Sequence, residues 1–233
     1  MEGPLDTLLE QGLDILAEKD DSARDLLAGQ AREEIAAKLQ GYIGEIELFN
    51  AAYGLVGAAD HQELVVKHIL DSLAPLGPLT GLLKELGAVG APLDIADAGS
   101  GAGLPGIPLA IVLKNHPFTL IERMGRRVGF LRNTIAVLGL KNVEVEQAEV
   151  EKAPQDRFGL VTFRAFRPLE PAMIKALFRL LTPQGVLAAY KARSEKIQEE
   201  MTPIKDLVGS WEVIETPVPF LEEERRLVVI RQR

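Results

Sequence analysis

The stretch DIADAGSGAGLPGIP, residues 94–108, decides the fold because it joins a short apolar run to a glycine-rich turn. The run ends in Asp97, and the glycines follow at Gly99, Gly101, Gly103 and Gly106. Pro105 suits the first turn of a helix, where its missing N–H leaves no hydrogen bond unmade. The stretch therefore predicts a strand, a tight turn and a helix, an order that is typical of cofactor-binding sites.

Short apolar runs separated by amphipathic helical patterns continue from residue 93 to the C-terminus. Strand and helix alternate strictly through the fifth run, which predicts an α/β fold with a doubly wound parallel sheet and helices on both faces. The runs at 210–219 and 225–233 are separated only by FLEEE, so we expect them to pair as an antiparallel hairpin. This outline favours a Rossmann-like methyltransferase sheet, which uses S-adenosylmethionine (AdoMet), over a dehydrogenase sheet.

Before residue 90 the apolar residues recur at helical spacing, as in HQELVVKHIL, and no β-rich run interrupts them. We expect residues 1–90 to form an α-helical N-terminal segment packed on the catalytic core, and residues 91–233 to form the AdoMet-dependent methyltransferase domain. His68 and Asp71 lie three residues apart on one helix face. That spacing favours a structural helix contact over a place in a binding site.

Composition excludes several classes of protein. The 233 residues include no cysteine and three histidines, which excludes disulfides, thiolate metal sites and cysteine nucleophiles and leaves little for a metal centre. The N-terminus is acidic, and no apolar run reaches about eighteen residues, so neither a signal peptide nor a membrane span is indicated. We expect a cytoplasmic monomer without a resident metal.

The formal net charge of −8 is unevenly distributed. Residues 1–92 contain 16 acidic and 6 basic side chains, whereas residues 93–233 contain 18 acidic and 20 basic ones. The half of the chain that holds the glycine turn is therefore the half expected to meet a polyanion such as RNA.

Two cofactors compete for the glycine turn. Residues 101–106 satisfy G-x-G-x-x-G, the dinucleotide fingerprint, and Glu122 ends the next strand, where a carboxylate accepts hydrogen bonds from the ribose of either cofactor. Asp97, however, would repel a pyrophosphate about 4 to 6 Å away by a few kcal/mol and would attract the ammonium and sulfonium of AdoMet. We favour AdoMet; the alternatives are an NAD-dependent oxidoreductase and a turn that only packs strand against helix.

The predicted cofactor site spans the ends of three strands. At the third, the adenine is expected to lie against backbone groups and the small Ala148, although carboxylates such as Glu149 are more often solvated. The predicted cofactor-binding residues are Asp97, Gly99, Ser100, Gly101, Gly103, Leu104, Glu122, Ala148 and Glu149.

The fourth apolar run, FGLVTFRAFRPLE, carries Arg164 and Arg167, where a methyl acceptor is expected to arrive. The absence of cysteine and of an Asn-Pro-Pro-Tyr element fits an acceptor such as guanine N7, which has a free lone pair and needs no general base. We assign Arg164 as the catalytic residue, contacting guanine O6, a phosphate or the cofactor. The predicted RNA-binding residues, for which a solvated surface role is the alternative, are Arg123, Arg126, Arg127, Arg167 and Lys191.

Four segments, DAGSGAGLPGIPLAI, TLIERMGRRVGFLR, VTFRAF and HILDSL, resemble the RsmG (GidB) family of bacterial small-subunit ribosomal RNA methyltransferases, and the similarity continues to ERRLVVIRQR at the C-terminus. The resemblance implies AdoMet-dependent methylation of guanine N7 in 16S rRNA near the decoding site, with 16S rRNA or the small subunit as partner. It also implies that Asp97, the first three glycines of the turn and Glu122 bind AdoMet, and that Arg164 lies beside the reacting groups.

The sequence departs from this family pattern at four positions. Gly54 and Val56 replace the usual Asn and Thr, Glu149 stands where Arg is common, and Ala192 replaces a Gly. These changes bear on the acceptor more than on the methyl donor. They keep open a third hypothesis, a catalytically silent AdoMet-binding or RNA-binding module.

Overall fold

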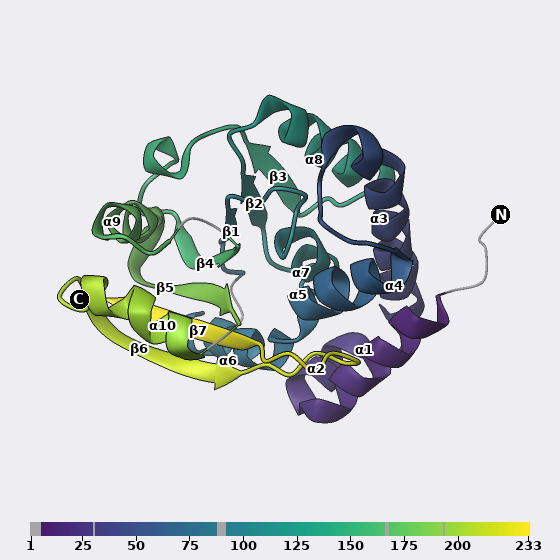
Figure 1. Cartoon of the computed structure of the whole chain (residues 1–233), viewed down its shortest axis with the longest axis horizontal. Coiled ribbons are helices and arrows are strands. Elements are labelled where there is room, and N and C mark those ends of the chain that lie inside the picture. The colour runs from purple at the N-terminus through teal and green to yellow at the C-terminus, as the bar shows by residue number, and fades with distance from the viewer. Residues whose placement is uncertain (1–5, 30, 88–91, 166–167, 193) are drawn as a thin grey trace.

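A seven-stranded sheet in the order β3-β2-β1-β4-β5-β7-β6 forms the centre of the computed structural model (Figure 1), which describes residues 6–29, 31–87, 92–165, 168–192 and 194–233. Strands β1 to β5 run parallel, and β7 lies antiparallel to both β5 and β6. The predicted α/β sheet with a terminal antiparallel hairpin is therefore confirmed. The strands are β1 (Ile95–Ala98), β2 (Phe118–Ile121), β3 (Val143–Glu146), β4 (Phe158–Arg164), β5 (Leu181–Lys191), β6 (Val208–Glu215) and β7 (Arg226–Gln232).

Helices flank the sheet on both faces (Figure 1), and an all-helical segment precedes it, as predicted. This helical segment contains α1 (Thr7–Lys19), α2 (Asp21–Leu27), α3 (Ala31–Tyr53), α4 (His61–Leu64), the π-helix η1 (Val65–Leu70), α5 (Asp71–Leu73) and α6 (Leu76–Leu86). The later helices are α7 (Gly106–Val112), α8 (Gly125–Leu138), α9 (Pro171–Leu180) and α10 (Ser194–Met201), with the 3-10 turns η2 (Val150–Lys152) and η3 (Thr202–Ile204).

The connection between β3 and β4 differs from the predicted strict alternation of strand and helix. Only the three-residue turn η2 lies between these strands. Pro154 lacks a backbone N–H, and Asp156 adopts a left-handed conformation with φ of 51°, so the segment cannot continue as an α-helix. The prediction of a full helix at this connection was wrong because turn residues override the spacing of the apolar runs.

The hydrophobic core has two parts, one on each face of the sheet. Alternate residues of each central strand point to opposite faces, so Ile95 and Leu160 pack with the helical segment and α7, while Ala96 and Val161 pack with α9 and α10. All four side chains are at most 1% exposed. Burial on both faces explains why these runs are continuously apolar and not alternating.

Two buried tyrosines tie the helical segment to the sheet. The hydroxyl of Tyr42, on α3, donates to the carbonyl of Ala102 in the glycine turn at 2.8 Å. The hydroxyl of Tyr190, on β5, donates to the carbonyl of Ser72 at 2.9 Å. Each buried hydroxyl and the carbonyl that it binds thereby gain a hydrogen-bond partner. The two bonds also hold the helical segment against the strand ends.

Gly106 allows α7 to pack closely on the sheet. A Cβ atom at this position would lie 2.5 Å from Leu120 Cδ2 and 2.7 Å from Asp97 Oδ2. The backbone N–H of Gly106 also donates to Asp97 Oδ2 at 3.1 Å. Only glycine provides this close approach, which sets the distance between the start of α7 and the end of β1.

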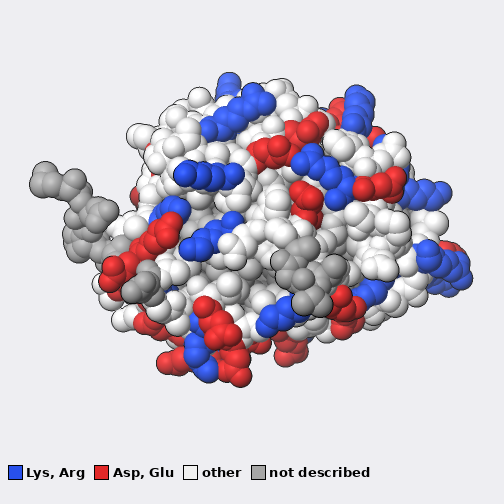
Figure 2. Space-filling model, turned by 180° about the vertical axis from the view of Figure 1, so that it is seen from behind, with Lys and Arg blue, Asp and Glu red and all other residues white. Residues whose placement is uncertain are grey.

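Acidic and basic side chains are interspersed on the face opposite the view of Figure 1 (Figure 2). Within the ranges given above, no helix is long and apolar enough to cross a membrane. The same ranges contain no group of three or more His, Cys, Asp or Glu side chains able to hold a metal ion.

Replacing Gly106 with alanine tests the close packing of α7. We expect Gly106→Ala to lower the free energy of unfolding by about 1 to 3 kcal/mol, because the new methyl group overpacks a buried contact. Gly129→Ala is the matched control, since a Cβ atom added there would meet no described atom within 4 Å beyond the neighbouring backbone of α8 itself, and it should stabilise the helix by at most about 1 kcal/mol. Urea unfolding followed by circular dichroism measures both; equal effects would contradict the overpacking at Gly106.

His61 links three helices through two carboxylates, and this link makes stability depend on pH. Its ring nitrogens lie 2.6 Å from Glu47 Oε1 and 2.6 Å from Asp6 Oδ2, and the hydrogen bond with Glu47, followed by that with Asp6, raises the pKa of His61 above 6.5. The stabilisation is therefore fully present below pH 6.5 and is lost as pH rises through the raised pKa.

We accordingly expect His61→Gln to lower the free energy of unfolding at pH 6 and to change it less at pH 9. The side chain is half exposed, so the difference should stay below about 1 kcal/mol. Urea titrations at the two pH values provide the measurement. If the variant loses the same free energy of unfolding at pH 6 and at pH 9, the charged form of His61 does not contribute to stability.

Candidate active site

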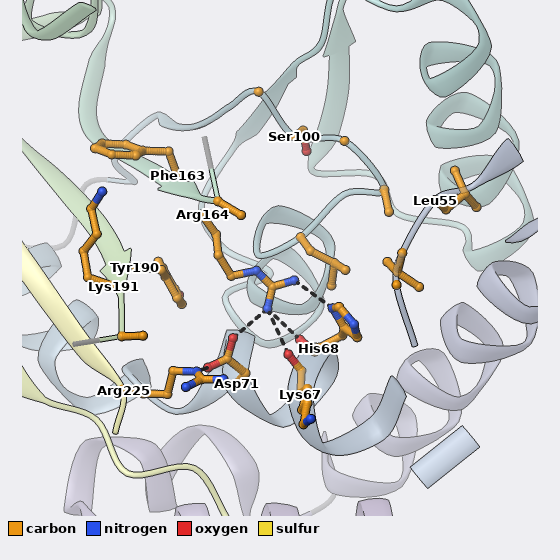
Figure 3. Close-up of a pocket in the computed structure, with 18 of the residues that line it drawn as sticks. Leu55, Lys67, His68, Asp71, Ser100, Phe163, Arg164, Tyr190, Lys191 and Arg225 are labelled. Atoms are coloured by element: carbon orange, nitrogen blue, oxygen red, sulfur yellow. Dashed lines mark hydrogen bonds and ion pairs between the residues drawn. The ribbon is translucent and has the colours of Figure 1, made fainter. Parts of the chain in front are cut away.

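Two adjoining pockets lie at the carboxyl ends of the parallel strands, the edge where open α/β sheets bind their ligands. The larger has a volume of about 590 Å³ and is bounded by the glycine turn, the ends of β4 and β5, η1, α5 and the start of β7 (Figure 3). The smaller has a volume of about 290 Å³ and lies between the ends of β1, β2 and β3. Gly99, Arg127 and Ala165 border both pockets, so the two adjoin at these residues, and together they are called the cleft.

The glycine turn exposes its backbone to this cleft. Gly99, Gly101 and Gly103 all have positive φ, between 61° and 95°, a conformation that side chains other than glycine rarely adopt. Gly99, Ser100, Gly101 and Leu104 line the larger pocket. These four predicted cofactor-binding residues therefore border the cleft, and Gly103 packs at the turn beside Ile107.

Asp97 lies beneath the turn and not on the cleft wall. The side chain is fully buried, and its Oδ2 accepts hydrogen bonds from the Ser100 hydroxyl at 2.6 Å and from the Gly106 N–H at 3.1 Å. Burial raises the pKa of Asp97 to about 6, although the hydrogen bond from Ser100 lowers it. The sequence predicted that Asp97 attracts a cofactor cation directly or through a water molecule; a direct contact does not fit this position, because the carboxylate is directed into the turn.

Glu122 directly follows β2 and lines the smaller pocket. Its Oε2 accepts from the Gly101 N–H at 2.9 Å, and its Oε1 accepts from the Met124 N–H at 2.8 Å. Each carboxylate oxygen retains a further lone pair for a ligand hydroxyl. The carboxylate thus connects the end of β2 to the glycine turn at the place predicted for a ribose.

The end of β3 supplies the remaining predicted cofactor residues. Ala148 and Glu149 both line the smaller pocket, as expected for an adenine site. The Glu149 carboxylate forms an ion pair with Lys152 at 2.9 Å. The small methyl group of Ala148 leaves the pocket open beside Val150.

Arg164 projects from the end of β4 into the larger pocket, where the sequence placed the catalytic arginine (Figure 3). Its Nη1 lies 2.8 Å from Asp71 Oδ2 and also contacts the carbonyl oxygens of Lys67 and His68 at 3.5 and 3.3 Å. The next residue, Ala165, has a φ of 47°, a left-handed conformation that is uncommon outside glycine. The strand therefore ends abruptly at the cleft.

The helical segment supplies one wall of the cleft, which spacing alone did not indicate. His68 and Asp71 both line the larger pocket, so the predicted structural contact is also a part of the site. Burial, and next the positive charge of Arg164, lower the pKa of His68 to about 4, and the ring is neutral near pH 7. The π-helical turn η1 presents two carbonyl groups to Arg164, a geometry that a helical repeat does not predict.

Arg225 was also missed. It precedes β7, lines the larger pocket, and donates from Nε to Asp71 Oδ1 at 3.1 Å. One carboxylate therefore binds two arginines that are 61 residues apart in the sequence. The two adjacent arginines at the start of the last strand can be seen in the sequence, but nothing in the sequence indicates that Arg225 contacts Asp71.

The predicted RNA-binding residues are distributed around the cleft. Arg123 lines the smaller pocket, Arg127 borders both pockets, and Lys191 lines the larger one, where it forms an ion pair with Glu200 of α10. Arg126 is exposed and stacks over the Tyr53 ring at 5.7 Å. Arg167 lies outside the described residues.

Like Glu149, the other three departures from the family pattern lie at the cleft or beside it. Gly54 ends α3 with a φ of 57°, a conformation that glycine and asparagine tolerate best, so its exchange for the usual Asn preserves the helix end. Val56 lines the larger pocket, and Asn50 Oδ1 accepts from its N–H at 3.0 Å. Ala192 is exposed at the pocket edge, and its carbonyl accepts from Arg226.

Comparison with known proteins points to one family. Residues 35–229 match the family GidB, described as rRNA small subunit methyltransferase G. The chain is 40% identical to ribosomal RNA small subunit methyltransferase G of Treponema denticola over 225 residues, which covers 87% of this chain and 89% of that protein. It is 39% identical to the protein of the same name from Klebsiella pneumoniae over 197 residues, 84% of this chain and 88% of that protein.

Solved structures share the fold at lower identity. A tRNA (m1A58) methyltransferase from Aquifex aeolicus superposes with a TM-score of 0.53 at 15% identity, covering 68% of this chain and 69% of that one. A predicted O-methyltransferase from Agrobacterium tumefaciens gives a TM-score of 0.51 at 22% identity, covering 70% and 79%. These similarities identify a methyltransferase-type sheet.

Two substitutions at Asp97 separate its charge from its hydrogen bonds. In Asp97→Asn the amide oxygen can still accept from Ser100 and Gly106, so we expect the AdoMet affinity to stay within about threefold of wild type. Asp97→Ala removes the oxygen that accepts both hydrogen bonds and should weaken AdoMet binding by about 1 to 3 kcal/mol. Isothermal titration calorimetry with AdoMet distinguishes the variants. Equal losses of AdoMet affinity in both variants would instead favour the charge attraction, direct or through a water molecule, that the sequence predicted.

Proposed function

The chain belongs to the GidB family, rRNA small subunit methyltransferase G, and from this premise we propose that it methylates N7 of a guanine in 16S rRNA, near the decoding site. Family membership makes it an AdoMet-dependent methyltransferase. The observation that carries the proposal is the junction of the two pockets at Gly99, Arg127 and Ala165. It connects a site suited to an adenosine with a site lined by arginines.

The residues around the smaller pocket fit the cofactor. The glycine turn offers backbone groups without side chains in the way, and Glu122 offers acceptors for ribose hydroxyls at the end of β2. Ala148 and Glu149 would border the adenine, while Ser100 and Leu104 line the larger pocket on the other side of the turn. AdoMet, when bound, supplies an electrophilic methyl group on a sulfonium.

Guanine N7 suits the chemistry of the larger pocket. N7 attacks with its own lone pair and loses no proton, so the reaction needs alignment and removal of water and no general base. His68, which is neutral near pH 7, has its Nδ1 3.5 Å from Arg164 Nη2. We assign Arg164 to orienting the acceptor, because its Nε has no partner among the described residues.

Asp71 makes this assignment electrostatically reasonable. Methylation at N7 leaves a positive charge on the guanine, which an uncompensated guanidinium would oppose. The ion pair between Asp71 and Arg164, at 2.8 Å, compensates that charge while the arginine keeps its hydrogen-bond donors. Arg164 can then contact guanine O6 and leave the N7 lone pair free.

The acceptor strand would cross the basic residues at the rim of the cleft. Arg123, Arg127 and Lys191, which line the pockets, would contact its phosphates, and the exposed Arg126, over the Tyr53 ring, would add a further contact. We propose that the enzyme works as a cytoplasmic monomer on 16S rRNA or on the small subunit. The division at residues 90 and 91 belongs to the same proposal, with the helical segment closing one side of the methyltransferase domain.

The alternatives receive less support. A nicotinamide-dependent oxidoreductase is not favoured, because the sheet ends in the antiparallel hairpin and the relatives are named as methyltransferases. A catalytically silent module is likewise not favoured, since the glycine turn, Glu122 and Arg164 are all in place at the cleft. Measured turnover is what separates an active enzyme from a silent one.

The direct test is the transfer of labelled methyl from AdoMet to small ribosomal subunits that lack this modification, and in parallel to naked 16S rRNA. The proposal predicts labelled 7-methylguanosine at a single site after nuclease digestion. Label in another base would contradict the assigned acceptor. Tight AdoMet binding with no transfer to either substrate would contradict the enzymatic function.

Arg164→Ala tests the role of the β4 arginine. We expect the variant to bind AdoMet within about tenfold of wild type and to turn over at least about a hundredfold more slowly, since the lost contact orients the acceptor. Calorimetry and single-turnover transfer measure the two quantities separately. Arg179→Ala on α9 is a control of the same charge change outside the cleft, and wild-type turnover in Arg164→Ala would refute the role.

A further inference from the structure

The cluster of Arg164, Asp71 and Arg225, which lines the larger pocket, contains two positive charges and one negative charge. Asp71 Oδ2 binds Arg164 Nη1 at 2.8 Å, and Asp71 Oδ1 binds Arg225 Nε at 3.1 Å. The side chains of the three residues are 14%, 8% and 23% exposed, in the order Arg164, Asp71 and Arg225. Burying this net positive charge costs free energy, and a bound anion that neutralises the charge would remove that cost.

Other basic residues of the pocket already have carboxylate partners. Lys67 pairs with Glu63 at 2.8 Å, Lys191 pairs with Glu200, and Arg226 pairs with Glu224 at 2.7 Å. Arg225, by contrast, shares its only described carboxylate partner with Arg164, and its second contact is the neutral carbonyl of Glu224. The unbalanced charge is therefore localised at this cluster.

The cluster lies at the opposite end of the pocket from the glycine turn. Figure 3 shows Ser100 at one end and Asp71 with Arg225 at the other, with Arg164 extending between them. An anion bound by Arg225 would thus lie on the far side of Arg164 from the turn that holds the cofactor. If the glycine turn binds AdoMet, we expect the acceptor RNA to enter the pocket from the side of Arg164 that faces away from the turn.

We propose that Arg225, held by Asp71, binds one phosphodiester of the acceptor RNA next to the target guanine. The inference rests on the proposed function and adds a specific contact to it. A phosphodiester carries one negative charge, which balances the net charge of +1 on the cluster. The guanidinium of Arg225, which uses Nε for Asp71, can bind phosphate oxygens through its other N–H groups. Nη2 of Arg225 has no partner among the described residues and supplies such N–H groups.

Asp71 acts as the positioning residue of this site. Its two oxygens fix the orientation of Arg164 for the base and of Arg225 for the phosphate, so one carboxylate sets the spacing of both contacts. Asp71 belongs to α5, Arg164 to β4, and Arg225 precedes β7. The helical segment thereby determines how the acceptor lies over the sheet.

The test compares Arg225→Gln with Arg231→Gln, a control on β7 that removes the same charge from a surface pair with Glu85 and Glu212. Binding to unmodified small subunits is measured by filter retention between about 50 and 200 mM KCl. We expect Arg225→Gln to weaken binding by about tenfold at about 100 mM KCl and to reduce the salt slope by about 1, as for one lost phosphate contact. Arg231→Gln should match wild type in both.

Binding of S-adenosylhomocysteine, measured by calorimetry, identifies the source of the anion. The proposal predicts that Arg225→Gln binds it within about twofold of wild type. If the variant instead binds it at least about tenfold more weakly and keeps the wild-type salt slope, the anion is the cofactor carboxylate and the proposal is overturned. An unchanged slope and affinity for subunits overturns it as well.

Asp71→Asn tests the positioning role with steady-state kinetics. We expect a higher KM for subunits and a lower kcat, because both arginines lose their fixed orientation. In the double variant with Arg225→Gln the increase in KM should not exceed that of the larger single variant, since the two residues act as one unit. Additive increases in KM would contradict the positioning role. Methyl transfer by wild type in the same assay shows that the proposed function itself holds.

Discussion

The carboxylate of Asp97, buried between β1 and α7, is the interaction on which the site depends. Its Oδ2 accepts from the Ser100 hydroxyl and the Gly106 N–H, so it fixes both ends of the turn that joins strand to helix. A buried ionisable group is tolerated only when its hydrogen bonds are made, and here they are made by the turn itself. The close approach at Gly106 belongs to this geometry, and the loop glycines between the two contacts adopt positive φ angles.

The N-terminal helical segment holds two parts of the site in position. Tyr42 holds the glycine turn from one side, and Asp71 holds the arginine of β4 from another. Acidic composition had suggested that this segment stays away from RNA, yet it contributes the carboxylate that orients two guanidinium groups. A single negative charge in a basic cleft can thus serve binding by setting the geometry of its partners.

The sequence was sufficient to predict the fold and the residues at the carboxyl ends of the strands. Periodicity located the parallel strands and the terminal hairpin, and the carboxyl ends of β1, β2 and β4 led to the glycine turn, Glu122 and Arg164. It could not show that Asp97 faces into the turn, because local spacing does not determine the direction of a buried side chain. It also could not join Asp71 to Arg225, which lie 154 positions apart and meet only through tertiary packing. The missing helix between β3 and β4 reflects turn residues that interrupt an otherwise regular alternation.

Our interpretation requires that a glycine turn organised by Asp97 holds the adenosine on one side and presents the methyl group to Arg164 on the other. A crystal structure with S-adenosylhomocysteine would decide whether it does. We expect an adenine beside Ala148, ribose hydroxyls within hydrogen-bonding distance of the Glu122 carboxylate, and the thioether sulfur on the Arg164 side of the turn. An adenosine bound away from Glu122, or a sulfur separated from Arg164 by the turn, would refute this arrangement.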